Sequence, residues 1–163
     1  MVNMNKFNKK SKDAYNKMAD GYDNSPEGKF TEKFKTLLLS AVTLRENYNV
    51  LDVACGNGSL LAAMGKKESI NGFGVDIAEQ MIKNAAAKNP NMVFHSSGCE
   101  AIPFENNLMD VITVCAAYHH FPDTAAFAKE AKRLLKQGGK IYIADIYLPS
   151  VLRVILRKRA KIN

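Results

Sequence analysis

The sequence has 163 residues, of which 47% are apolar and 24% are charged, and this is the composition of an ordinary globular domain. No apolar run approaches the roughly 18 residues that cross a bilayer, and residues 1–12 are basic and polar, without the apolar segment of a signal peptide. A membrane span and a secretory signal are therefore not expected, and the predicted location is cytoplasmic.

The net charge of +7 belongs to the two ends of the chain. Residues 1–12 carry four lysines, and residues 151–163 carry three arginines and two lysines, with no acid in either segment. The sequence between them is slightly acidic. Basic ends are usually solvated, so no specific nucleic-acid partner is expected, and attraction to nucleic acid or anionic lipid is the less favoured interpretation.

The three cysteines, Cys55, Cys99 and Cys115, are odd in number and far apart in the sequence. Their spacing matches neither a disulfide framework nor a zinc site, so we expect reduced thiols and no bound metal.

Hydrophobic periodicity predicts two N-terminal helices, around residues 7–19 and from the Ser25-Pro26 start signal to Ala41. Short apolar runs then predict strands at 49–54, 72–75, 92–94, 109–115 and 140–146. Helical patterns between them lie at 59–66, 78–88 and 123–136.

This alternation predicts an α/β fold with three layers, in which helices cover both faces of a parallel sheet. A single domain over residues 1–163 is expected. It divides into an N-terminal helical cap (1–45), a core (46–147) and a basic C-terminal helix (148–163).

The first strand runs into a glycine-rich loop, a feature that allows a close approach of the backbone to a ligand. Its residues are Asp52, Val53, Ala54, Cys55, Gly56, Asn57 and Gly58. A dinucleotide fingerprint needs glycines where this chain has Ala54 and Leu61, and no Gly-Lys-Ser/Thr follows for a phosphate loop.

The second strand ends at Asp76, eighteen residues after Gly58. A carboxylate there is suited to accept hydrogen bonds from the two hydroxyls of a ribose. The alternative role is an N-cap for the helix that starts near Ala78, and the two roles are compatible.

Four stretches together carry a resemblance to a known family. They are Val-Leu-Asp-Val-Ala-Cys-Gly-Asn-Gly at 50–58, Gly-Val-Asp-Ile-Ala-Glu-Gln-Met at 74–81, Glu-Ala-Ile-Pro-Phe at 100–104 and Arg-Leu-Leu-Lys-Gln-Gly-Gly at 133–139. In this order they resemble the motifs of class I, Rossmann-like S-adenosylmethionine-dependent methyltransferases. With Tyr-His-His-Phe-Pro-Asp at 118–123, the sequence is most similar to the small-molecule type that includes ubiquinone and menaquinone biosynthesis enzymes.

The resemblance implies a sheet of order 3-2-1-4-5 and a role for each matching residue. Asp52 and the backbone of Ala54, Cys55, Gly56, Asn57 and Gly58 would hold the methionine end of S-adenosylmethionine and of its product, S-adenosylhomocysteine. Asp76 would hold the ribose, and Ile77 and Met81 would face the adenine. Gly98 and Cys99 would border the adenine edge, and Ala116 would line the sulfonium.

Methyl transfer is an in-line displacement that mainly requires alignment of the donor and a small-molecule acceptor. His119 or His120 is the candidate base where the acceptor must lose a proton, and Tyr22 is the candidate cover over the cofactor. A structural role for the histidines is the more favoured interpretation.

Two other classes of function stay open. One is a catalytically idle cofactor-binding module. The other, less favoured, is a nucleic-acid methyltransferase, whose Asn/Asp-Pro-Pro-Tyr motif is replaced here by Cys115-Ala116-Ala117-Tyr118.

The sequence departs from the family pattern in three places. Gly98 stands where a carboxylate usually meets the adenine amino group, so that edge loses a partner unless another group replaces it. Gln137 replaces a usual proline. The antiparallel strand pair that normally follows the fifth strand is not apparent, so the fifth strand is predicted to lie at a sheet edge and to promote self-association.

Overall fold

The computed structural model describes residues 4–146 of the chain. The elements, in chain order, are α1 (Met4–Met18), the 3-10 helix η1 (Ala19–Asn24), α2 (Pro26–Ala41), β1 (Asn49–Val53), α3 (Ser59–Lys67), β2 (Asn71–Asp76), α4 (Glu79–Lys88), β3 (Val93–Ser96), β4 (Met109–Cys115), the short 3-10 helix η2 (Tyr118–His120), α5 (Thr124–Leu134) and β5 (Leu135–Ala144). The predicted C-terminal helix at 148–163 lies outside the described residues.

The five strands form one sheet in the order β3-β2-β1-β4-β5, and every neighbouring pair is parallel. The α/β class and the 3-2-1-4-5 order are thus confirmed. The chain moves outward from β1 in one direction and, after β3, returns to continue from β4 in the other. Loops at the carboxyl ends of β1 and β4 therefore diverge, and this is where parallel sheets of this kind bind ligands.

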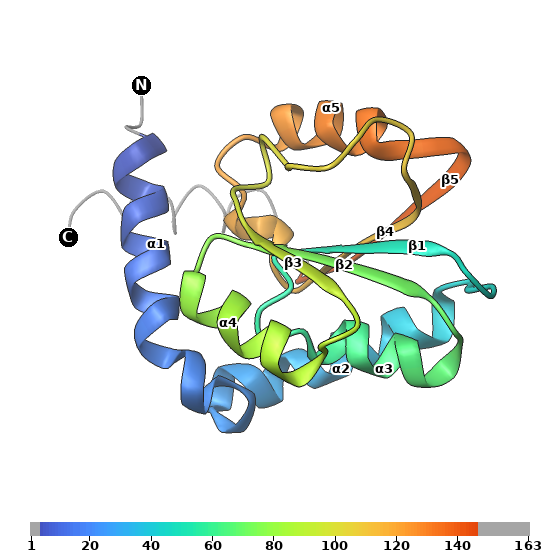
Figure 1. The fold of residues 1–163 in the computed structure, drawn as a ribbon. Helices are drawn as coiled ribbons and strands as arrows, with labels where there is room; N and C mark the ends of the chain where they lie inside the picture. The colour runs from blue at the N-terminus through green and yellow to red at the C-terminus, as the bar shows by residue number, and fades with distance from the viewer. Residues whose placement is uncertain (1–3, 147–163) are drawn as a thin grey trace.

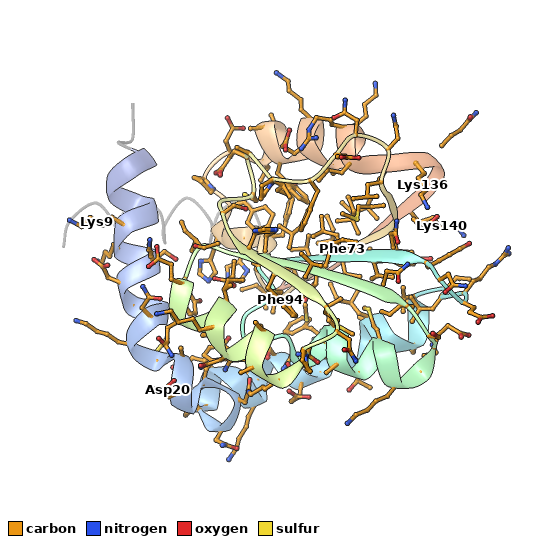
Figure 2. The ribbon with its side chains drawn as sticks, viewed as in Figure 1. Lys9, Asp20, Phe73, Phe94, Lys136 and Lys140 are labelled. Atoms are coloured by element: carbon orange, nitrogen blue, oxygen red, sulfur yellow. The ribbon has the colours of Figure 1, made fainter. Side chains whose placement is uncertain are left out.

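Helices cover both faces of the sheet, as Figure 1 shows: α5 lies over one face, and α2, α3 and α4 lie over the other. Alternate residues of each strand supply the two cores, because successive side chains point to opposite faces. Leu51 and Ile112 pack with α5, whereas Val50 and Val111 pack with α2 and α3. In Figure 2, Phe73 and Phe94 mark these two opposite layers.

The start of α2 follows the predicted cap chemistry. The Ser25 hydroxyl accepts the N–H of Gly28 at 3.0 Å, and Pro26 occupies the first helical turn, where its missing N–H costs nothing. This fixes the turn between η1 and α2, and with it the placement of the N-terminal segment over the carboxyl ends of the strands.

The boundary between α5 and β5 differs from the prediction. The sequence pattern extended the helix to residue 136 and began the strand at 140, but the strand begins at Leu135. Pairing with β4 jumps from Met109 opposite Leu135 to Val111 opposite Lys140, so the intervening residues bulge. Gly138, at φ +79°, accommodates the bulge.

Across residues 4–146, none of the helices is both long and apolar enough to cross a membrane.

Candidate functional site

A cavity opens at the carboxyl ends of β1, β2 and β4, beneath α1, η1 and α2. Eleven of the twelve residues predicted to contact the cofactor line it: Asp52, Ala54, Cys55, Gly56, Asn57, Asp76, Ile77, Met81, Gly98, Cys99 and Ala116. These residues come from four separate segments of the chain. The sequence motifs give the order of these residues along the chain, and the fold brings them together around one cavity.

Gly58 is the predicted residue that does not line the cavity. It adopts φ +75°, and a Cβ there would lie 2.9 Å from the Asn89 side chain and 3.1 Å from Ala85 of α4. Its lack of a side chain lets the start of α3 pack against α4. Gly58 therefore shapes the loop rather than contacting what the cavity holds.

The backbone of the loop turns through left-handed conformations at Ala54 (φ +60°) and Gly56 (φ +53°). Glycine adopts such angles freely, whereas alanine bears a steric cost of about 1–2 kcal/mol. Ala116, after the neighbouring strand β4, stands at φ +51° and lines the same cavity. The two strained alanines thus lie at the loops where β1 and β4 diverge, as is common at functional sites.

Asp76 joins the glycine-rich loop to the end of β2. Its Oδ2 accepts the N–H of Gly56 at 2.9 Å, and its Oδ1 accepts the N–H of Ala78 at 2.9 Å. A carboxylate can accept about four hydrogen bonds, so each oxygen retains capacity for a ligand hydroxyl. The N-cap of α4 is Ala78, without a side-chain cap. The alternative role of Asp76 as an N-cap is therefore wrong.

Two carboxyls of the cavity, the partly buried Asp76 and the buried Asp52, have perturbed acidities. Burial raises the pKa of Asp76, although the N–H groups of Ala78 and Gly56 oppose the rise. Asp52 is 2% exposed, and its Oδ1 accepts the hydroxyl of Thr113 at 2.7 Å. Burial raises the pKa of Asp52 to about 7, even though this hydrogen bond favours the charged form.

Asp52→Asn is expected to raise the free energy of unfolding at about pH 8 by roughly 1–4 kcal/mol and to change it little near pH 4. The carboxyl binds its proton more tightly in the folded protein, where its pKa is about 7, than in the unfolded chain, with a value of 3.8. The stability that the Asp52 carboxyl contributes is present below its pKa in the unfolded chain. It is lost as the pH rises through its pKa in the folded protein, whereas the amide of the variant does not titrate.

Urea denaturation of both proteins between about pH 4 and pH 8 measures this difference. Asp76 titrates in both proteins, so subtracting the curves isolates Asp52 to a first approximation. A difference that stays constant with pH would mean that folding does not raise the pKa of Asp52.

All three thiols border the cavity, and all are free. Burial raises the pKa of Cys55, raises that of Cys99 to about 12 with a further contribution from the Glu100 carboxylate, and raises that of Cys115 to about 12. The protonated thiol is a poor nucleophile, so these cysteines act as small apolar walls near neutral pH.

The two candidate histidines occupy different environments. The Nδ1 of His119 lies 2.7 Å from Asp145 Oδ1, its backbone N–H is donated to Asp145 Oδ2 at 2.9 Å, and the residue does not line the cavity. His119 thus ties η2 to the segment after β5. His120 lines the cavity, and its pKa is lowered by desolvation and by the adjacent His119.

Tyr22 reaches the cavity from η1. Burial, followed by the neighbouring Tyr15, raises the pKa of its phenol to about 12. The phenol is therefore neutral at physiological pH, which suits a covering and hydrogen-bonding side chain better than a base.

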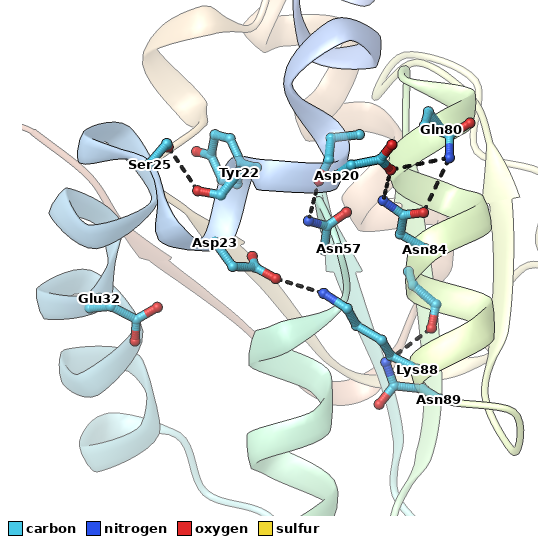
Figure 3. Close-up of polar contacts among 12 residues, drawn as sticks. Asp20, Tyr22, Asp23, Ser25, Glu32, Asn57, Gln80, Asn84, Lys88 and Asn89 are labelled. Atoms are coloured by element: carbon cyan, nitrogen blue, oxygen red, sulfur yellow. Dashed lines mark hydrogen bonds and ion pairs between the residues drawn. The ribbon is translucent and has the colours of Figure 1, made fainter.

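Contacts with α4 and the glycine-rich loop hold η1 in place, as Figure 3 shows. Asn57 donates to the backbone oxygen of Ala19 at 2.9 Å, Asn84 donates to Asp20 at 3.1 Å, and Lys88 pairs with Asp23 at 2.6 Å. The Asn57 contact is buried and the other two are exposed. The N-terminal segment is thus attached to the loop that it covers.

Sequence reasoning missed three charged residues of the cavity, Asp23, Lys35 and Glu100. Lys35 shares a face of α2 with Thr31 and Leu38, at helical spacing. A lysine on the sheet-facing side of a helix was the available signal, and its ammonium lies 2.7 Å from Glu32. Glu100 belongs to a quoted motif, but its direction could be learned only from the structure.

Over the described range, no group of three or more His, Cys, Asp or Glu side chains is placed to hold a metal ion.

Comparison with known proteins places these features in a family. The family described as methyltransferase domain matches residues 51–143. Demethylmenaquinone methyltransferase from Chlorobaculum parvum is 36% identical over 100 residues, which are 61% of this chain and 42% of that protein. The chain spans less than half the length of such curated relatives.

Solved structures agree with the match. The YcgJ protein of Bacillus subtilis has a TM-score of 0.72 at 27% identity, over 80% of this chain and 58% of that one. Phosphoethanolamine N-methyltransferase 2 of Haemonchus contortus, solved in complex with S-adenosyl-L-methionine, shares the fold with a TM-score of 0.66 at 17% identity, over 90% of this chain and 40% of that one. The chain therefore belongs to the methyltransferase domain family, with the fold of the class I S-adenosylmethionine-dependent methyltransferases.

Proposed function

We propose that the chain binds S-adenosylmethionine in the cavity at the carboxyl ends of β1, β2 and β4 and takes part in methyl transfer to a small-molecule acceptor. The observation that carries the proposal is Asp76. Its carboxylate is held by the N–H groups of Gly56 and Ala78, beside a glycine-rich loop, with acceptor capacity to spare. This arrangement suits the paired hydroxyls of a ribose.

The other residues that line the cavity suit the adenine and the methionine end of S-adenosylmethionine. Ile77 and Met81 offer apolar surface next to Asp76, where a purine would lie. Asp52, the loop backbone and Lys35 also line the cavity, so hydrogen-bonding groups and a positive charge are available for an amino-acid zwitterion. The residues present therefore fit S-adenosylmethionine from end to end.

When bound, S-adenosylmethionine supplies a methyl group on a sulfonium sulfur, and the neutral thioether of S-adenosylhomocysteine is a good leaving group. The chain's residues then need to align the acceptor and keep water out. In our proposal Ala116 lines the methyl side of the cavity, and Tyr22 covers it from η1. His120 is the candidate to accept a proton from the acceptor, because it lines the cavity and its lowered pKa keeps the ring neutral.

For the acceptor, we propose a small aromatic compound of the quinol type. The support comes from relatives named as demethylmenaquinone methyltransferase and 2-methyl-6-phytyl-1,4-hydroquinone methyltransferase, each 36% identical to this chain over the aligned region. Ala117, Phe121 and Pro122 add apolar surface to the cavity near His120. A cytoplasmic location stays a prediction.

Calorimetric titration with S-adenosylhomocysteine, followed by an assay for its release with quinol-type and unrelated acceptors, tests this function. Binding together with acceptor-dependent release is the expected result. Binding without release for any acceptor would favour the alternative of a catalytically idle cofactor-binding module. Absence of binding would remove the proposal.

Self-association through the β5 edge is a further part of the proposal. Within residues 4–146, β5 is the last strand in the sheet order, and Ile141 and Ile143 are 40% and 43% exposed. These two side chains border a groove beside α5 that is lined by Phe127, Ala131 and Leu135 among others. Exposed apolar edge strands pair with other chains.

Sedimentation velocity at rising protein concentration measures this association. The double change of Ile141 and Ile143 to lysine is expected to shift the protein toward the monomer, because charged side chains at an edge oppose pairing. The same distribution for both proteins at every concentration would contradict a role for this edge.

A further inference from the structure

The loop after β3 places a carboxylate where the sequence pattern lacks one. Gly98 has no side chain, and a Cβ built there would lie 2.6 Å from Glu100 Oε2. The Glu100 carboxylate therefore occupies the space in which a side chain at position 98 would begin. Both residues line the cavity, together with Cys99 between them.

One oxygen of this carboxylate is buried without a partner. Glu100 Oε1 is enclosed and accepts no hydrogen bond from any residue in the described part of the chain, and no ion pair found there involves Glu100. A buried carboxylate oxygen without a donor is unfavourable, and native structures rarely retain one without a reason. This atom is suited to a ligand that carries an N–H or O–H.

The residues that line the cavity near Glu100 indicate which kind of ligand group could donate this hydrogen bond. Ile77 and Met81 supply apolar surface in the same cavity as Glu100 and Asp76. A ribose held at Asp76 would direct its base along this surface, and a purine with an exocyclic amino group would carry its N–H donors at the far edge. A hydrogen bond from an amine to a carboxylate is charge-assisted, so it is stronger than one between neutral groups.

We propose that Glu100 binds the adenine amino group of the cofactor and thereby determines selectivity for adenine, in place of a carboxylate at position 98. This inference depends on the proposed function, because it assumes S-adenosylmethionine in the cavity. The expectation drawn from Gly98 was a lost partner for the adenine amino group unless another group replaced it, and Glu100 is the proposed replacement. The required acceptor is present, but it comes from two residues further along the chain.

The test compares S-adenosylhomocysteine with its 6-deamino analogue, which has hydrogen in place of the amino group, by titration calorimetry. The wild-type protein is expected to prefer the amino form by about 10- to 150-fold, the range for a hydrogen bond to a charged group. Glu100→Ala should reduce this preference to nearly 1. Glu100→Gln, which keeps the shape and a neutral acceptor, should give an intermediate ratio.

Glu105→Gln is the matched control, because Glu105 is an exposed carboxylate in the same loop that does not line the cavity. It should leave the preference unchanged. A double variant, Gly98→Asp with Glu100→Ala, should restore part of the preference, since removing the Glu100 side chain frees the space into which the new carboxylate at position 98 would extend. This relocation would not be expected if Glu100 only supported the loop.

The outcomes separate the two proposals. If S-adenosylhomocysteine does not bind the wild-type protein, the proposed function fails. If it binds, but Glu100→Ala and Glu100→Gln keep the full preference for the amino form, the backbone or another side chain binds the adenine amino group. Only the role of Glu100 is then overturned. A wild-type protein that binds both forms equally also overturns it.

Discussion

Asp76→Ala is expected to weaken the binding of S-adenosylhomocysteine by about 1.5–3 kcal/mol or more, which is roughly 10- to 150-fold in the dissociation constant. The loss has two sources. The carboxylate is the proposed acceptor for the ribose hydroxyls, and it also holds the N–H of Gly56 at 2.9 Å, which fixes the glycine-rich loop. Titration calorimetry at one pH and salt concentration measures the change.

Asp110→Ala is the control for a general effect of losing a carboxylate that accepts a backbone N–H. Asp110 Oδ2 accepts the N–H of Asn49 at 2.8 Å and pairs with Lys136 at 2.7 Å, at the amino ends of the strands. This variant should lose some stability and keep its affinity for the ligand. Equal affinities for wild type and Asp76→Ala would show that Asp76 does not contribute to ligand binding.

Gly28→Ala is expected to destabilise the protein by about 1–3 kcal/mol or more and to weaken ligand binding at the same time. A Cβ at residue 28 would lie 2.0 Å from the backbone oxygen of Tyr22 and 2.9 Å from its carbonyl carbon. Backbone cannot rotate away as a side chain can, so the first turn of α2 must separate from η1. The ~1 kcal/mol that alanine gains over glycine in a helix is too small to offset this clash.

Gly21→Ala provides the comparison within the same segment. A Cβ at Gly21 meets nothing within 4 Å, and its φ is not in the left-handed region. Urea denaturation should therefore show a shift of only a few tenths of a kcal/mol for this variant. If Gly28→Ala were as stable as Gly21→Ala, the contact between η1 and α2 would not be close in solution.

The fold was predictable to the extent that local patterns determine it. The apolar runs at β1 and β4 and the glycine and proline boundaries are local features, and alternation of strands and helices restricts the sheet to a few arrangements. The start of β5 was not predictable, because the bulge opposite Met109 depends on pairing with a strand about 26 residues away in the sequence. Sequence periodicity does not report such long-range register.

The candidate site divides in the same way. Backbone positions such as Gly56 and a carboxylate at a strand end such as Asp76 were predictable, since both follow from where a parallel sheet binds ligands. Side chains that arrive from other segments were not. Lys35 comes from α2 in the N-terminal segment. The Glu100 carboxylate extends into the space beside Gly98, and a sequence motif does not encode the direction of a side chain.

The polar contacts between η1 and α4 have a kinetic consequence. The segment above the cavity is anchored by the buried hydrogen bond from Asn57 to Ala19 and by exposed pairs such as Lys88 with Asp23. Exposed pairs of this kind typically contribute less than about 1 kcal/mol each. Displacing η1 therefore disturbs none of the hydrogen bonds of the sheet. We therefore expect the residence time of a molecule in this cavity to depend on how often η1 lifts, and we expect salt, which screens the exposed pairs, to shorten it.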